Sequence, residues 1–215
     1  NPAITVTGNW VNSVNVTQGS GNITVTGILQ NNGNTITLGS GTLTVTNTMQ
    51  INTGTVATGS GTVTVTGVYQ NNSGTLTCGS GSVIFKGTYQ NNGTFTAGAG
   101  TVYFSGTSQS LTDNSATGTI FKNVTFNCTG TATMGAGTGN FSVASTGVLT
   151  LVSPAKLVAG SAAAAYLTLK SDATGSATVA ALTGTSTITG FVNVQRYVTG
   201  GSATYRGYRL LSAPV

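Results

Sequence analysis

The sequence predicts an all-β protein: a right-handed parallel β-solenoid (β-helix) with coils of about 20 residues, followed by a less regular β segment. One pattern occurs four times within residues 19–97, with Gly-Ser pairs starting at positions 19, 39, 59 and 79. Within each repeat, short stretches alternate β-branched and polar residues, as a strand does. This combination is typical of coils that stack into one core, and the crossover preference of parallel strands favours the right hand.

One repeat, residues 59–78, illustrates the expected coil. Its alternation predicts three short strands separated by three corners. The expected strands are residues 63–66, 68–70 and 75–78. At the first corner we expect Gly59 and Gly61 to adopt positive φ, which glycine tolerates best.

Stacking of the coils predicts rows of inward side chains, each row taking one residue from every coil. Residues about 20 positions apart should then all be apolar. Three positions of the repeat meet this expectation. The rows are Ile23, Leu43, Val63, Val83 and Val102; Val25, Val45, Val65, Phe85 and Phe104; and Ile36, Val56, Leu76 and Phe95. Ile4 and Val6 are expected in a first coil, with Trp10 near its second side, where the ring would help to cover the open end.

Two polar positions also recur with the period of the coil. Identical amide side chains stacked in this way form hydrogen bonds along the axis of a β-structure. The expected ladders are Gln30, Gln50, Gln70, Gln90 and Gln109, and Asn32, Asn52, Asn72 and Asn92. We interpret them as structural. A sugar-binding polar strip would need aromatic platforms beside it, and the nearby Tyr69 and Tyr89 are expected in the core.

The second half of the chain repeats less regularly. Alternation continues at residues 119–128 and 140–152 and resumes at 188–197, so strands are expected there. We therefore predict two regions, regular solenoid repeats in residues 1–112 and an irregular β continuation with a C-terminal β segment in residues 113–215.

Composition excludes several classes of function. Nine of the 215 residues are charged, there is no His or Glu, and the only acids, Asp113 and Asp172, lie in turn-like sequences. General acid–base catalysis needs paired titratable groups, so no enzyme, catalytic residue, metal site or cofactor is predicted. The scattered positive charges indicate no nucleic-acid binding, and no apolar run is long enough for membrane insertion.

The two cysteines, Cys78 and Cys128, alternate in phase with apolar neighbours, which predicts that both point inward. They are 50 positions apart, more than two coils. Two coils are already farther apart than the Cα–Cα distance that a disulfide spans. We expect two free, buried thiols.

Threonine pairs recur on one outward face of the expected solenoid. The pairs are Thr5 and Thr7, Thr24 and Thr26, Thr44 and Thr46, and Thr64 and Thr66. Such an array resembles the surface of ice-binding solenoids, although Ile84 and Lys86 interrupt it and outward threonine suits any strand. Binding of ice or a glycan by this face is the alternative functional hypothesis.

The C-terminal part resembles very large, repeat-rich surface proteins of Bacteroidetes. The matching elements are LTLKSD at 167–172, GFVNVQRY at 190–197 and YRLLSAPV at 208–215, with GAGTVYFSG at 98–106 resembling their coils. The resemblance implies type IX secretion, an extracellular or cell-surface location and a role as an adhesin or fibre. Because Asn1 leads directly into an expected strand without a signal peptide, we expect a mature or excised segment.

The main functional hypothesis is a non-catalytic structural subunit of a fibre or adhesin stalk. Exposed solenoid ends or terminal strands invite pairing with another chain, so the expected partners are further copies (a homopolymer) or other surface proteins. Arginine interleaved with tyrosine is typical of interface hot spots, although it also fits a cation–π brace at the end of the solenoid. The candidate interface residues are Arg196, Tyr197, Tyr205, Arg206, Tyr208 and Arg209.

Overall fold

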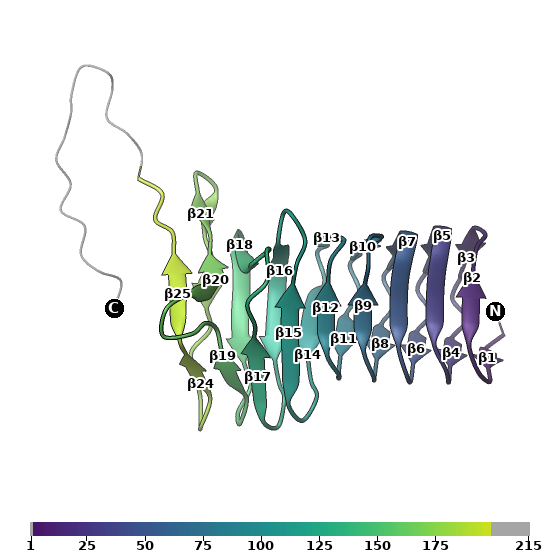
Figure 1. Ribbon diagram of the computed structural model, residues 1–215, viewed down its shortest axis with the longest axis horizontal. Helices are drawn as coiled ribbons and strands as arrows, with labels where there is room; N and C mark the ends of the chain where they lie inside the picture. The colour runs from purple at the N-terminus through teal and green to yellow at the C-terminus, as the bar shows by residue number, and fades with distance from the viewer. Residues whose placement is uncertain (1, 199–215) are drawn as a thin grey trace, which may run out of the picture.

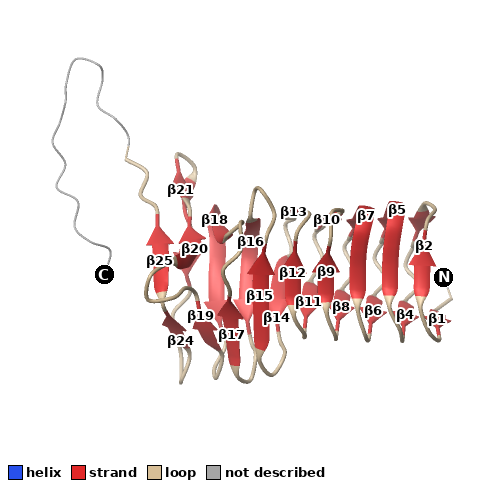
Figure 2. Ribbon diagram, viewed as in Figure 1, coloured by secondary structure: helices blue, strands red, loops and turns tan. Residues whose placement is uncertain are grey.

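The computed structural model describes residues 2–198 as one continuous stack of strands, with no helix in that range (Figures 1 and 2). The chain winds from β1 at one end of the stack to β25 at the other. Every strand pairing between successive coils is parallel, and the only paired strands of the described chain that run antiparallel are β21 and β22. The prediction of an all-β parallel solenoid is confirmed.

One long sheet forms the first side of the coils. In its spatial order it contains β1 (Ile4–Val6), β4 (Ile23–Val25), β6 (Leu43–Val45), β8 (Val63–Val65), β11 (Val83–Phe85), β14 (Thr101–Phe104), β16 (Thr119–Phe126), β18 (Phe141–Leu151), β20 (Ala165–Leu169) and β25 (Phe191–Val194), with β23 (Thr178–Val179) also paired to β18.

The second sheet forms the other two sides of the coils. It contains β2 (Trp10–Asn12), β3 (Val16–Thr17), β5 (Leu29–Thr37), β7 (Met49–Ala57), β9 (Tyr69–Asn71), β10 (Thr75–Thr77), β12 (Tyr89–Asn91), β13 (Thr94–Thr96), β15 (Gln109–Asp113), β17 (Thr131–Met134), β19 (Lys156–Val158) and β24 (Thr187–Thr189). A small hairpin, β21 (Ser171–Asp172) and β22 (Gly175–Ser176), projects beside β20 (Figure 1).

The coils lengthen along the chain. In the first sheet, the register advances by 20 residues from Ile23 to Leu43, by 22 from Val102 to Val124 and by 25 from Val124 to Leu149. The sheet continues without interruption past residue 112, where the sequence predicted a boundary between two regions. That boundary stays a prediction, and the observed change is a gradual increase in the length of the coil.

The three predicted inward rows are confirmed. Their members pair in register from coil to coil, and each side chain is at most 7 % exposed. Two of the rows change from aliphatic to aromatic along the chain, at Phe85 and at Phe95, whereas the row that begins at Ile23 stays aliphatic through Val102. Phe104 stacks on Phe85 and on Phe126, with ring centroids 5.7 and 5.0 Å apart. Tyr69 and Tyr89 also lie in the core, and their rings are 5.0 Å apart.

The glycines of the first corner are required by the stacking of the coils, and the predicted positive φ at Gly59 and Gly61 is wrong. Neither residue has a positive φ. A Cβ at Gly61 would instead overlap the carbonyl oxygen of Gly41 in the preceding coil, and a Cβ at Gly81 would overlap that of Gly61. Glycine at these corners therefore allows the backbones of neighbouring coils to approach closely.

The predicted glutamine ladder is confirmed over three coils and wrong at its last member. Gln30 Nε2 donates to Gln50 Oε1 at 2.6 Å, and Gln50 Nε2 donates to Gln70 Oε1 at 3.2 Å. Gln109 falls out of register because the coil has lengthened, and Thr112 takes the ladder position. The Gln109 side chain is buried and donates to two main-chain carbonyl oxygens of the preceding coil at 2.9 Å.

The predicted ladder of outer asparagines is present and extends beyond the residues named from the sequence. Asn52 Nδ2 donates to Asn32 Oδ1 at 2.7 Å, and Asn72 Nδ2 donates to Asn52 Oδ1 at 2.6 Å. Asn114 Nδ2 likewise donates to Asn92 Oδ1 at 2.8 Å. Asn114 was missed because it follows Asn92 by 22 residues rather than 20.

A buried row of amides, which was missed in the sequence, lines the inside of the solenoid. The successive inward positions are Asn12, Asn31, Ile51, Asn71, Asn91 and Asp113. The amide of one coil donates to the side-chain oxygen of the next, as Asn71 Nδ2 does to Asn91 Oδ1 at 2.9 Å. Asn71 Nδ2 also bonds to the main-chain oxygen of Gly74 at 3.1 Å. The row thus provides hydrogen bonds for a corner that water does not reach.

Asp113 ends this row and is fully buried. Its Oδ1 accepts hydrogen bonds from the main-chain nitrogen and the hydroxyl of Ser115, at 2.8 and 2.6 Å. Its Oδ2 lies 3.4 Å from the donating amide of Asn91. The contact with the Ser115 nitrogen is the turn-forming bond that the sequence indicated. However, the carboxyl group lies in the core, because residue 113 occupies an inward position of the coil.

Ile51 interrupts the amide row and leaves one acceptor without a donor. The Oδ1 of Asn71 has no hydrogen-bond partner within the described chain, because the side chain before it in the row is Ile51. We predict that Ile51→Asn destabilises the fold by about 2 kcal/mol less than Ile36→Asn, since only the former amide meets an unpaired acceptor. Both isoleucines are fully buried, so the denaturant midpoints of the two variants can be compared directly. Equal losses of stability in the two variants would contradict the role of the amide row as a source of hydrogen bonds.

Candidate functional site

Four threonines of the predicted outward face lie in β1, β4, β6 and β8 and pair in register: Thr5, Thr24, Thr44 and Thr64. The other four follow directly after the ends of these strands: Thr7, Thr26, Thr46 and Thr66. Two of the eight hydroxyls form hydrogen bonds with main-chain groups. Thr26 Oγ1 accepts from the nitrogen of Gly8 at 3.0 Å, and Thr46 Oγ1 donates to the carbonyl oxygen of Thr26 at 2.7 Å. The face ends at β11 and β14, where Ile84 and Tyr103 take the threonine position. Whether this face binds anything stays a prediction.

A second threonine array lies on the third side of the coils. We call its members the third-side threonines: Thr35, Thr37, Thr55, Thr75, Thr77, Thr94 and Thr96. Only Ala57 interrupts the array, and within residues 2–198 none of these hydroxyls has a hydrogen-bond partner. The signal for it was present in the sequence, because the Thr-x-Thr spacing recurs in the third strand with the period of the coil. The sequence-based prediction named the threonines of the first strand alone.

Of the predicted C-terminal interface residues, Arg196 and Tyr197 are described and both are exposed. Tyr197 is 51 % exposed, and its main-chain nitrogen donates to Ser171 Oγ at 3.0 Å. Arg196 lines a small pocket of about 190 Å³ together with Lys170 and Val194. The other four candidates lie outside the described residues: Tyr205, Arg206, Tyr208 and Arg209.

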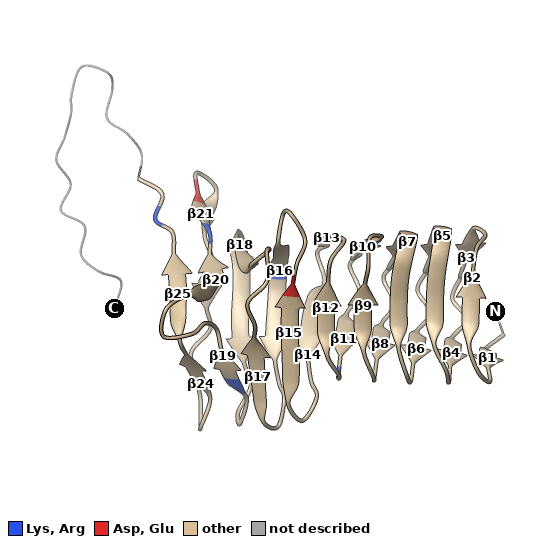
Figure 3. Cartoon of the chain, in the orientation of Figure 1, with Lys and Arg blue, Asp and Glu red and all other residues tan. Residues whose placement is uncertain are grey.

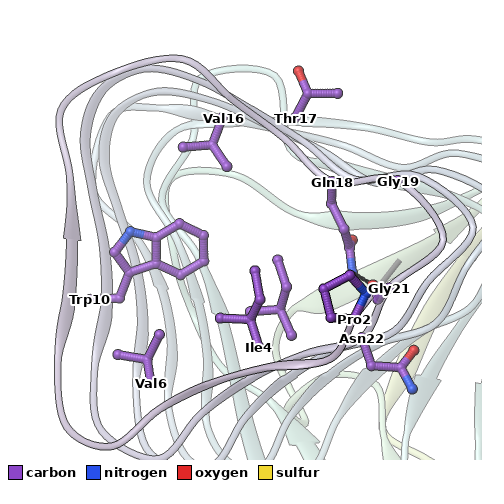
Figure 4. A pocket seen from close by; sticks show the side chains of 11 residues that line it. Pro2, Ile4, Val6, Trp10, Val16, Thr17, Gln18, Gly19, Gly21 and Asn22 are labelled. Atoms are coloured by element: carbon purple, nitrogen blue, oxygen red, sulfur yellow. Dashed lines mark hydrogen bonds between the residues drawn. The ribbon is translucent and has the colours of Figure 1, made fainter.

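Within residues 2–198, no strand pairs with the outer edge of the first coil. Figure 4 shows the first coil from this end, with Ile4, Val6, Trp10 and Val16 directed into the lumen. These side chains line a cavity of about 510 Å³. Ile4 is 53 % exposed, whereas Ile23, its partner in the next coil, is 5 % exposed. Trp10 therefore lines the opening without closing it.

Charge is concentrated in the later coils, as Figure 3 shows, and the described charged groups form no reactive cluster. Among residues 2–198 no three His, Cys, Asp or Glu side chains gather in one place. Asp172 is exposed in the β21–β22 hairpin and accepts hydrogen bonds from Ser145 Oγ at 2.7 Å and from Thr174 Oγ1 at 2.6 Å. These bonds, with one from the Thr174 nitrogen, lower the pKa of Asp172 to about 2.

We predict that the hairpin contacts of Asp172 weaken in acid. Because the folded pKa lies below the ordinary value of 3.8, the bonds contribute fully above about pH 4 and are lost as the pH falls toward 2. An NMR titration should give a carboxyl midpoint near 2, with the Thr174 amide signal moving at the same pH. Ser145→Ala should raise that midpoint, and an unchanged midpoint would contradict the assigned cause.

Both cysteines are free and buried, as predicted. Burial raises the pKa of Cys78 to about 12, so its thiol is protonated at neutral pH and is a poor nucleophile. No helix long and apolar enough to cross a membrane occurs in residues 2–198.

Stacked parallel coils, amide ladders and hydrophobic rows together define the class of this protein: it is a β-solenoid repeat protein. The chain belongs to the Toastrack DUF4097 family, which it matches over residues 3–147. The match thus covers all the regular coils and ends within β18. No curated protein and no solved structure that was compared matches the chain.

Proposed function

We propose that the chain is a non-catalytic structural subunit of an extracellular or cell-surface fibre or adhesin stalk, self-associating through its solenoid ends or terminal strands. The observation that carries the proposal is that each end of the described stack leaves a strand edge unpaired, at β1 and at β25. Apolar side chains are exposed at both ends, with Ile4 53 % and Phe191 57 % exposed. Unpaired edges with exposed apolar groups favour pairing with another chain.

The location and the partners belong to the same proposal. Resemblance of the C-terminal part to surface proteins of Bacteroidetes supports export by type IX secretion. The partners are then further copies of this chain or other surface proteins. Absence of catalysis is proposed because the two carboxyl groups, Asp113 and Asp172, are each held by donors of their own chain.

The test is the state of assembly of the full chain. Electron micrographs of concentrated protein should show end-to-end filaments, and sedimentation should show species larger than the monomer. Arg206→Ala with Arg209→Ala separates two roles of the C-terminal cluster: a hot spot loses assembly with the fold intact, whereas a brace loses thermal stability of the monomer. Monomers alone at every concentration would refute the proposal.

A second candidate function is binding of an ordered hydroxyl-rich surface, ice or a glycan, and the third-side threonines favour it. Their hydroxyls have no partner within residues 2–198 and repeat at the spacing of the coils, about 4.8 Å, on a side of the solenoid without charge. Inhibition of ice recrystallisation tests the ice case, and sedimentation with an insoluble polysaccharide tests the glycan case. Thr75→Lys should abolish binding while Thr44→Lys on the first side should not; equal effects would place the binding elsewhere.

A further inference from the structure

The outer face of the first sheet carries a polar pocket in the part of the chain where the coils lengthen. Its volume is about 290 Å³. The start of β18 and the end of β20 line it, together with two connections: residues 116–118, which lead into β16, and residues 138–140, which lead into β18. Both β18 and β20 are paired on each of their edges, so the pocket belongs to the body of the stack.

The longer coils supply the walls of this pocket. The register advances by 22 residues from Thr119 to Phe141 and by 26 from Phe141 to Leu167. As a result, the connection between β15 and β16 projects beyond the ends of the earlier coils (Figure 1). The two connections hold each other in place, since Thr138 Oγ1 donates to the carbonyl oxygen of Asn114 at 2.7 Å. A wall that is already ordered lowers the cost of binding a ligand.

Ser142 lies at the bottom of the pocket. Its neighbour Phe141 is an inward residue, so the alternation of the strand directs Ser142 outward, in register with Thr168 of the next coil. Although it points outward, Ser142 is only 6 % exposed. Its hydroxyl has no hydrogen-bond partner within residues 2–198. A buried hydroxyl without a partner costs free energy, and a ligand that bonds to it recovers that energy.

Lys170 brings a positive charge to the same pocket. It follows Thr168 by two residues and is partly buried, and within the described chain its ammonium group has no partner. The carboxylate nearest to it in the sequence, that of Asp172, is bonded to Ser145 and Thr174 instead. Among the described residues no carboxylate lines the pocket. An unpaired cation in such surroundings favours an anionic ligand.

The other groups around the pocket are neutral hydrogen-bonding groups. The side chains of Thr117, Asn140 and Thr168 have no hydrogen-bond partner within residues 2–198. Gln195 accepts a bond from the nitrogen of Ser171 at 3.3 Å through Oε1, which leaves its NH₂ group available to a ligand. Hydroxyl and amide groups both donate and accept, as the hydroxyls of a sugar do. The lining therefore matches a ligand that has several hydroxyls besides its charge.

Size and the lack of a stacking surface narrow the ligand further. A volume of about 290 Å³ is close to the lower end of the range for small-molecule sites, and a lone inorganic anion would leave most of it to water. Phe141 lines the pocket but is only 1 % exposed, so it offers no ring face for a sugar to stack on. Charge and hydrogen bonds must then supply the affinity, which a neutral sugar cannot fully use.

We propose that this pocket binds a sugar acid, a single sugar ring that carries a carboxylate, as acidic polysaccharides do. The carboxylate bonds to Lys170, and the ring hydroxyls bond to Ser142, Thr168 and the amides of Asn140 and Gln195. This binding function is separate from the self-association of the proposed function. It is also separate from the third-side threonines, which lie on another side of the solenoid and in earlier coils.

Titration of the full chain with two matched sugars tests the ligand class. Glucuronate and glucose differ only in the carboxylate that replaces the hydroxymethyl group. Glucuronate should bind about 10-fold more tightly than glucose, because a hydrogen bond to a charged group is the stronger one. Acetate, a carboxylate without the ring, should also bind more weakly than glucuronate. No binding of glucuronate, or equal binding of glucose or of acetate, would overturn the proposal.

Removal of one positive charge at two places tests the role of Lys170. Lys170→Gln should weaken glucuronate binding about 10-fold and leave glucose binding unchanged, so that the preference for the acid disappears. Lys156→Gln is the matched control, because it removes the same charge from an exposed position in the second sheet. It should leave both affinities unchanged. Equal losses in the two variants would overturn the assignment of the carboxylate to Lys170.

Ser142→Ala separates binding from stability. Since the Ser142 hydroxyl has no partner in the fold, its removal should not lower the melting temperature, but it should weaken the binding of glucuronate and of glucose roughly 5-fold. The amide NMR signals of Thr168 and Lys170 should move on addition of glucuronate, and that of Thr75 on the third side should not. Unchanged affinity in Ser142→Ala, or movement of the Thr75 signal alone, would overturn the proposal.

Discussion

Replacing Phe104 by alanine is expected to lower the free energy of unfolding by about 3–5 kcal/mol, the range for loss of a buried aromatic side chain. Phe104 is fully buried and its ring contacts Phe85, Phe126, Phe121 and Tyr89, at centroid distances from 5.0 to 5.8 Å. The cavity left behind would separate the early coils from the later ones. Since stability in a solenoid depends on contacts between neighbouring coils, we expect one unfolding transition to become two.

Urea unfolding followed by circular dichroism measures both effects. Phe191→Ala is the control, because that ring is 57 % exposed and its loss should change stability by no more than about 0.5 kcal/mol. A loss below about 1 kcal/mol for Phe104→Ala would show that the aromatic rows do not hold the coils together.

The second large effect is expected from one methyl group at a corner of the coil. Gly61→Ala should destabilise the fold by about 3 kcal/mol, because its Cβ would overlap the carbonyl oxygen of Gly41, and main-chain atoms cannot move aside as side chains do. The expected readout is a lower melting temperature with reduced protection of amide hydrogens at the neighbouring corners.

A glycine with space around it is the matched control. The nearest atoms to a Cβ at Gly135 are 3.6 Å away, so Gly135→Ala should be neutral or stabilising by up to about 1 kcal/mol. Similar losses at the two positions would mean that the close approach of the coils is not the reason for glycine.

The regular coils could be predicted from the sequence because one period governs every row. Once Ile23, Leu43 and Val63 are aligned, the inward direction of the neighbouring residues follows from the alternation of a strand. The predictions were wrong where the period changes, as at Gln109, and where one type of residue can serve two structural roles. Glycine at Gly61 serves close approach rather than positive φ, and the sequence alone does not distinguish these roles.

The candidate surfaces were harder to predict than the core. Threonine spacing identified one array, but it did not reveal that Thr26 and Thr46 bond to the main chain while the third-side threonines have no hydroxyl partner within residues 2–198. The open cavity at Trp10 was not apparent either, because the sequence pattern of an inward residue is the same whether or not another coil covers it. Sequence periodicity shows which way a side chain points, and exposure at an end depends on what stacks against it.

The change from aliphatic to aromatic residues along the inward rows has a consequence for how the chain finds its fold. Val25, Val45 and Val65 are followed by Phe85 and Phe104 in the same row. Were the coils identical, a chain paired one whole repeat out of place would lose little, and shifted forms would compete with the native one. The change from Val65 to Phe85 makes the later coils fit differently from the earlier ones, so pairing of an early coil with a late one, in the same chain or in another molecule, is disfavoured.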